Sequence, residues 1–154
     1  MRRLVVGKGS QGVALAAMTL LILTVTLLLD GGRPVGTNLA PFEDLARLLH
    51  KAQRGKLLSV LFTSGAVGIA VNLFLFVPWG FIAWKFLDGP DRGALLTHAE
   101  VVFFGLVLSA GIEFVQLFLP TRAADIDDVI WNVFGALMGG LLAHVGREVR
   151  IEWG

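Results

Sequence analysis

The chain has 154 residues, of which 55% are apolar and 16% charged, against roughly 45–50% and about 25% in an ordinary soluble domain. With a mean hydropathy of +0.75, a water-soluble globule is excluded, because a body this small must cover itself with polar groups. The net charge of +1 argues against a nucleic-acid-coating surface, and the absence of cysteine excludes disulfides, thiolate metal sites and cysteine nucleophiles.

Four apolar stretches are long enough to cross a bilayer as helices. The first, residues 13–29, contains no charge and follows a basic segment, so a signal peptide is an alternative. Because the stretch leads into Asp30 and two glycines rather than a small-residue cleavage site, we expect a retained anchor. The other predicted spans are residues 66–87, 99–119 and 129–145. The sequence therefore predicts an all-α membrane protein, a four-transmembrane-helix bundle in which residues 1–154 form one domain.

The orientation of this bundle rests on a small charge difference. Four crossings put both termini on one side of the membrane. With the termini in the cytoplasm, seven Lys and Arg residues face inward and six face outward. The first span is also preceded by basic residues and followed by Asp30. The positive-inside rule therefore favours cytoplasmic termini.

Residues 41–54, between the first two spans, carry the signals of a short amphipathic helix. Pro41 stands at its start, acidic residues occupy its first turn, basic residues its last, and Gly55 follows. Apolar residues recur at helical spacing on one face. This pattern predicts an interfacial helix with its basic end near lipid phosphates. A solvated loop helix is the alternative.

Polar side chains in and beside the predicted spans gather at one depth. They are Asn72, Ser109, Glu113, Gln116, Arg122, Asp125, Asp128 and Asn132. At ~1.5 Å of rise per residue, Asn72 and Glu113 lie about 9 Å from the same side of the membrane, and Asn132 enters its span from that side. Because polar groups in hydrocarbon are costly, this common level predicts either a binding site or hydrogen bonds between helices.

Glu113 requires a specific explanation. A buried carboxyl must be neutral, paired with a cation such as Arg122, or bound to a metal or ligand. A hard cation held by Glu113, Asp125 and Asp128 with amide oxygens is chemically allowed, but a zinc site lacks ligands. Neither a metal nor a cofactor is predicted. Asp127, by contrast, is expected to stabilise a helix amino terminus.

Small residues indicate where helices touch. Gly135 and Gly139 form a GxxxG in the fourth span, and Gly105 with Ser109 repeats this spacing in the third. Direct packing of these two spans is therefore predicted.

Two sequence patterns that can indicate a nucleotide site or a catalytic triad occur without the structural elements that such sites require. The literal GxGxxG of residues 7–12 precedes a membrane span rather than a βαβ unit, so it does not indicate a dinucleotide site. His50, His98 and His144 fall in different segments, and only His50 is expected on the polar side. This distribution argues against a Ser-His-Asp arrangement.

Three blocks of the chain resemble the VanZ-like family of membrane proteins. The blocks are Thr37–Phe42 (TNLAPF), Asn72–Phe81 (NLFLFVPWGF), and Ser109–Gln116 (SAGIEFVQ) followed by Arg122 and Asp125–Gly135 (DIDDVIWNVFG). They appear in order over about residues 35–145. The resemblance implies a bacterial, multi-pass protein of the cell envelope. The family's namesake is associated with low-level resistance to teicoplanin, a glycopeptide that binds cell-wall precursors, but resistance itself does not carry over to this chain.

Together these features favour a protein of the bacterial cytoplasmic (inner) membrane that binds or modifies a lipid head group or lipid-linked cell-wall intermediate near the outer leaflet. Arg122 would contact phosphate, and Glu113 and Asp128 are the acid and base candidates if a reaction occurs. The ligand-binding candidates are Asn38, Asn72, Gln116, Arg122, Asp125 and Asn132.

The alternative is a non-enzymatic scaffold or accessory subunit whose polar cluster serves helix packing. The expected partners are a membrane lipid or lipid-linked envelope precursor, and a second copy of the chain or another envelope protein, but no nucleic acid. An ion or solute carrier is disfavoured, because the half facing the cytoplasm offers few polar groups.

Overall fold

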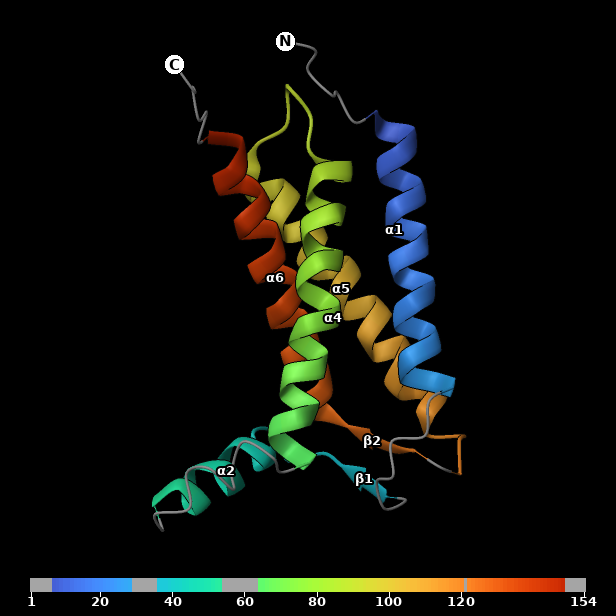
Figure 1. The fold of residues 1–154 in the computed structure, drawn as a ribbon, viewed down its shortest axis with the longest axis vertical. Helices are drawn as coiled ribbons and strands as arrows, with labels where there is room; N and C mark the ends of the chain where they lie inside the picture. Colours follow the sequence, from blue (N-terminus) through green and yellow to red (C-terminus); the bar gives the residue numbers. More distant parts are fainter. Residues whose placement is uncertain (1–6, 29–35, 54–63, 121, 149–154) are drawn as a thin grey trace.

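The computed structural model describes residues 7–28, 36–53, 64–120 and 122–148, and its long helices form a bundle (Figure 1). The elements are α1 (Lys8–Leu23), the π-helical turn η1 (Thr24–Leu28), β1 (Gly36–Asn38), α2 (Glu43–Gln53), α4 (Ser64–Leu87), α5 (Ala94–Gln116), β2 (Ala123–Asp125) and α6 (Ile126–Glu148). Within the described ranges, four helices are long and apolar enough to cross a membrane. The predicted helical membrane architecture is confirmed.

The observed spans are Lys8–Leu28, Ala66–Leu87, Ala94–Gln116 and Ile126–Gly146. The first begins earlier than predicted, because Lys8–Gly12, with Gly9 and Gly12, are already helical after the extended residue Gly7. The third begins at Ala94 rather than Ala99, and Glu100, which lies within both the predicted and the observed span, forms an ion pair with Arg92 of the preceding loop. An ion pair with a nearby cation lowers the free-energy cost of placing a carboxylate near the end of a membrane helix.

Glycines set the closest helix contact, which joins α4 to α6. A Cβ atom at Gly139 would collide with the carbonyl of Val77, and one at Gly80 would collide with the backbone of Ala136. The predicted direct packing of the third and fourth spans is confirmed, because α5 contacts α6. The two glycines of the GxxxG, Gly135 and Gly139, nevertheless face α4 rather than α5. Gly105 of α5 does contact α6, where its Cβ would lie 3.0 Å from the Ala136 side chain.

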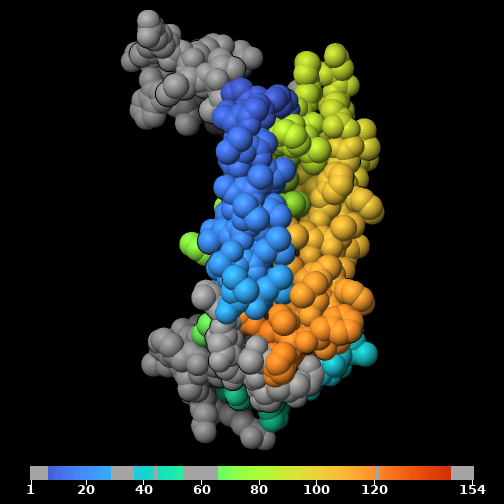
Figure 2. All heavy atoms as spheres, turned by 90° about the vertical axis from the view of Figure 1, so that its right-hand side faces the viewer, coloured from blue at the N-terminus to red at the C-terminus, as the bar shows by residue number. Residues whose placement is uncertain are grey.

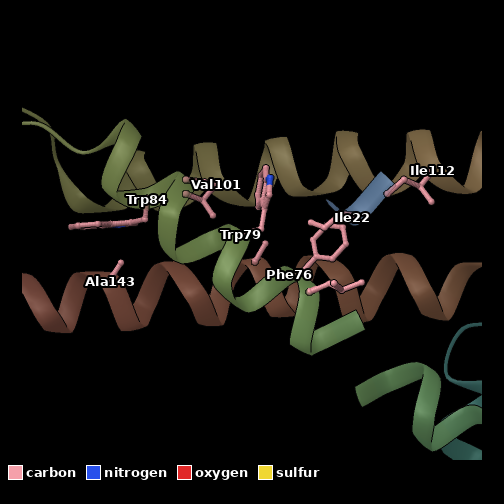
Figure 3. Close-up of a cluster of buried hydrophobic side chains, with 10 residues drawn as sticks. Ile22, Phe76, Trp79, Trp84, Val101, Ile112 and Ala143 are labelled. Carbon is pink, nitrogen blue, oxygen red and sulfur yellow. The ribbon is translucent and has the colours of Figure 1, made fainter. Parts of the chain in front are cut away.

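The apolar core lies along the bundle axis between α4, α5 and α6 (Figure 3). Trp84, Val101 and Ala143 occupy one end of this row, and Ile112 lies at the other. Many other large apolar residues point outward; Phe74, for example, is 79% exposed. An outward apolar surface is what lipid tails require of a membrane helix.

Helix α1 runs along the outside of the bundle (Figure 2) and contributes one buried side chain, Ile22. Polar contacts hold it in place. Lys8 Nζ donates to the carbonyls of Lys85 (3.1 Å), Phe86 (2.6 Å) and Asp88 at the end of α4. Such carbonyls have no partner within their own helix and attract a cation. Midway along α1, Trp79 Nε1 donates to Thr19 Oγ1 at 2.9 Å.

The end of the bundle away from the start of α1 and the end of α6 carries β1, β2 and α2 (Figure 1). The two strands pair in parallel, with Asn38 opposite Asp125. This pairing was not predicted, since strands of three residues give no periodic signal. The amphipathic helix α2 is confirmed, beginning at Glu43 rather than Pro41.

Replacing Gly139 by leucine is expected to destabilise the bundle by about 1–3 kcal/mol or more, because the added side chain must separate two backbones. Gly111→Leu is the matched control, since a Cβ there meets nothing within 4 Å and Gly111 is exposed on α5. Thermal unfolding in detergent, followed by the loss of monodisperse protein, measures both variants. Equal melting of the two leucine variants would contradict the assignment of the α4–α6 contact.

Candidate functional site

A polar cavity of about 230 Å³ lies where the ends of α1, α4 and α5 meet the link into α6. Its described lining consists of Val25, Thr26, Val67, Gly68, Val71, Asn72, Gln116, Arg122, Ala123 and Asp128. Among these residues Arg122 is the cation and Asp128 the anion. Asn72 Nδ2 donates to Asp128 Oδ1 at 2.8 Å, which fixes the carboxylate against α4.

The wall formed by α1 presents backbone carbonyls rather than side chains. Gln116 Nε2 donates to the Thr26 carbonyl at 3.0 Å, and an Nη atom of Arg122 donates to the Val25 carbonyl at 3.3 Å. Both acceptors lie in the π-helical turn η1 at the end of the first span. Carbonyls at a helix end need partners from outside the helix, and in a membrane the protein must supply them. Gln116 and Arg122 therefore join α1 to the rest of the site.

Two buried atoms of the cavity lining lack a hydrogen-bond partner: Nε of Arg122, which is a donor, and Oε1 of Gln116, which is an acceptor. The Gln116 side chain is 6% exposed. Within the described ranges Arg122 forms no ion pair, either with Asp128 or with Glu113. An arginine remains charged under all ordinary conditions. The cavity thus contains a cation whose charge no described side chain neutralises.

A second group of site residues connects the strands to α5. Asn38 Nδ2 donates to Asp125 Oδ1 at 3.0 Å, and Asn38 Oδ1 accepts from the backbone N–H of Ala40 at 3.0 Å. Glu113 Oε2 accepts from the backbone N–H of Asp125 at 2.7 Å. The carboxyl of Glu113 is thus buried against β2 rather than exposed to lipid or paired with Arg122. It does not line the polar cavity.

Glu113, Asn38 and Asp125 instead border a separate, apolar groove of about 370 Å³. Leu39, Leu106, Ala110, Phe114, Leu117, Ile126 and Val129 contribute most of its remaining lining. Among the described residues, no group of three or more His, Asp or Glu side chains is arranged to hold a metal ion.

Asp127 forms a hydrogen bond with the segment that precedes α2. Its side chain is 1% exposed and accepts the backbone N–H of Phe42, while its own N–H donates to Asp125 Oδ1 at 2.9 Å. Phe42 has a positive φ of 62°, which is unfavourable for a residue with a side chain. Asp127 does occupy the first turn of α6, as predicted. Its contact with a residue 85 positions earlier could not be read from that place in the helix.

Asn132 belongs to a third environment, between α5 and α6. Its Nδ2 donates to Ser109 Oγ at 2.9 Å, and both side chains are buried. Neither residue lines the cavity. This contact is a hydrogen bond between two membrane helices. For Asn132, the structure therefore matches the expectation of helix packing rather than that of a binding site.

The structure therefore divides the predicted site residues. Asn72, Gln116, Arg122 and Asp128 line one cavity; Asn38, Asp125 and Glu113 order the strands; Asn132 joins two helices. Sequence reasoning missed the carbonyls of Val25 and Thr26, because a backbone acceptor is available at any residue.

The fold and cavity define a multi-pass helical membrane protein with a polar site at one end of its bundle. Residues 13–147 match the VanZ/LLP1 family, and the chain belongs to it. No curated protein and no solved structure matches the chain.

Asp127→Ala is expected to destabilise the protein by about 1–3 kcal/mol, because the substitution removes a buried carboxylate and the N–H of Phe42 loses its acceptor in a partly buried hydrogen bond. The amide of Phe42 should then exchange with deuterium faster, which hydrogen–deuterium exchange with mass spectrometry measures. Glu43→Ala, which removes the exposed pair of Glu43 with Arg47, serves as the control and should change stability by less than about 0.5 kcal/mol. Unchanged exchange at Phe42 in Asp127→Ala would contradict this role.

Proposed function

We propose that this protein binds the phosphate of a lipid head group, or of a lipid-linked cell-wall intermediate, in the cavity lined by Asn72, Gln116, Arg122 and Asp128. The observation that carries the proposal is Arg122, whose Nε is buried without a partner and whose charge meets no described anion. Leaving such a donor unsatisfied is costly, and phosphate oxygens are its best-matched acceptors.

The position of the cavity supports a lipid as its ligand. Val67 and Val71 of α4 line it and are 49% and 41% exposed, within the span Ala66–Leu87. A ligand that enters between these residues passes apolar side chains before it reaches Arg122. A lipid satisfies both environments, with hydrocarbon outside and a charged group inside.

We place the cavity at the outer leaflet of a bacterial cytoplasmic membrane, with both termini in the cytoplasm. Family membership supports an envelope role, and the charges flanking the first span support the orientation. If a reaction occurs, Asp128 is the candidate acid or base at the phosphate, because it lines the cavity. Glu113 would act through Asp125 and β2, as a positioning residue.

The alternative function, a scaffold or accessory subunit, is favoured by a different contact. The buried hydrogen bond between Asn132 and Ser109 joins α5 to α6 without reaching the cavity. On this alternative, variants of the cavity would lower stability and leave lipid binding unchanged.

Arg122→Gln is expected to weaken the binding of anionic phospholipid by at least about tenfold, since a charge-assisted contact to phosphate is lost. Native mass spectrometry of the purified protein, titrated with phosphatidylglycerol, measures the bound fraction. Arg47→Gln on α2 is the matched control, because Arg47 lies outside the cavity and is 63% exposed. Equal binding by wild type and both variants would refute the proposed function.

The orientation can be tested with single cysteines, because the natural chain has none. Asp91→Cys, in the loop between α4 and α5, should be shielded from a membrane-impermeant maleimide in intact cells. Lys51→Cys, exposed on the polar side of α2, should react. The reverse pattern would place the cavity at the cytoplasmic leaflet.

A further inference from the structure

One face of α4 leads from the polar cavity into the membrane. Val67 and Val71 line the cavity, while Phe74 and Pro78 line an apolar groove farther along the same helix. Residues at positions i, i+4, i+7 and i+11 lie on one face of an α-helix, so these four side chains form a single stripe. All four are exposed. The stripe therefore joins the cavity to the groove.

We infer, on the basis of the proposed function, that a hydrocarbon chain of the bound lipid lies along this stripe and in the groove, while its phosphate occupies the cavity. The groove is lined by Ala70, Leu73, Phe74, Val77 and Pro78. The lipid is then recognised at two linked sites, a polar one at Arg122 and an apolar one on α4. A soluble phosphate compound would occupy the polar site alone.

The length of the stripe matches one leaflet of the membrane. From Val67 to Pro78 the helix rises about 16 Å at ~1.5 Å per residue. One leaflet supplies about half of the roughly 30 Å hydrocarbon core. The observed span begins at Ala66, so the stripe starts at the edge of the hydrocarbon and ends near its middle. A chain attached to a head group in the cavity therefore reaches the bilayer centre along α4.

The side chains of the groove suit a hydrocarbon chain. None of its five lining residues has a polar side chain, and Phe74 is 79% exposed. In a membrane such side chains are stabilised by dispersion contacts with whatever packs against them. A lipid whose phosphate is held in the cavity keeps one chain beside these residues, whereas the other lipids around the protein exchange freely.

Two other apolar grooves are less well placed for the same chain. The groove bordered by Glu113 shares no lining residue with the cavity. A groove between α1, α4 and α5 is lined on α4 by Trp79, Ala83, Phe86 and Leu87, which lie beyond Pro78 in the other half of the span. The groove at Phe74 continues the stripe that starts at the cavity.

Photocrosslinking tests whether the chain in the groove belongs to the lipid bound at Arg122. Wild type and Arg122→Gln are placed in nanodiscs with phosphatidylglycerol that carries a diazirine near the end of one acyl chain. Peptide mass spectrometry compares adducts on residues 70–78 with adducts around Phe103, which is 58% exposed near the middle of its span on α5. In wild type the α4 segment should be labelled at least about threefold more, the effect of retaining one chain beside it.

Arg122→Gln should remove this excess labelling of α4. Equal labelling of the two segments in wild type, or an excess that survives Arg122→Gln, would overturn the inference. A second copy of the chain is the competing occupant of this face. Because the natural chain has no cysteine, Phe74→Cys tests it: efficient disulfide-linked dimerisation on oxidation would assign the face to a second copy and also overturn the inference.

Phe74→Ala tests the contribution of the chain separately from that of the head group. By native mass spectrometry it should weaken phosphatidylglycerol binding by about threefold or more, since dispersion contacts are lost. Binding of glycerophosphoglycerol, which has the same head group and no chains, should not change. Phe103→Ala is the matched control and should alter neither ligand. Unchanged binding of phosphatidylglycerol by Phe74→Ala, or an equal loss of both ligands, would contradict the inference.

The two proposals fail in different ways. If Arg122→Gln weakens phosphatidylglycerol binding while labelling and Phe74→Ala show no preference for α4, the inference is wrong and the proposed phosphate site stands. If phosphatidylglycerol binding does not depend on Arg122, both are wrong.

Discussion

The structure depends on one constraint: within hydrocarbon, every polar group must find its partner in the protein. Elements far apart in the sequence are joined where this constraint applies. The carbonyls at the end of α1 take donors from Gln116 and Arg122, and the amide of Asp125 takes the carboxyl of Glu113. These contacts align the ends of three helices and a strand, and the cavity is the space left between them.

The constraint also explains the positions of several polar side chains. Glu113, Gln116 and Arg122 bond backbone groups near the ends of the spans, where such groups have no partner in their own element. Asn72 and Asn132 bond other side chains instead. Arg122 differs, since its contact with the Val25 carbonyl leaves Nε unsatisfied and its charge without a described counter-ion. Helix packing alone does not account for a donor and a charge that have no described partner, so Arg122 marks this cavity as a candidate binding site.

Composition and hydropathy were sufficient to predict the spans and the amphipathic helix, since each follows from local residue types. Partners were harder to predict. Gly139 was recognisable as a contact residue, but its neighbour depends on Gly80 of another helix. The pairing of Asn38 with Asp125 joins residues 87 positions apart in strands too short for a periodic signal. Glu113 was correctly expected to be buried, but a backbone amide as its partner leaves no trace in the sequence.

The peripheral position of α1 has a consequence for how the protein is assembled. Helices α4, α5 and α6 share a core to which α1 adds Ile22. The contacts that hold α1, from Lys8, Trp79 and Gln116, all require groups that are synthesised later in the chain. The first segment to enter the bilayer can therefore dock only after α4 has been synthesised, and the end of it that borders the cavity only after Gln116 and Arg122 have followed. The cavity would then form last, when Val25 and Thr26 of the first span meet Gln116 and Arg122.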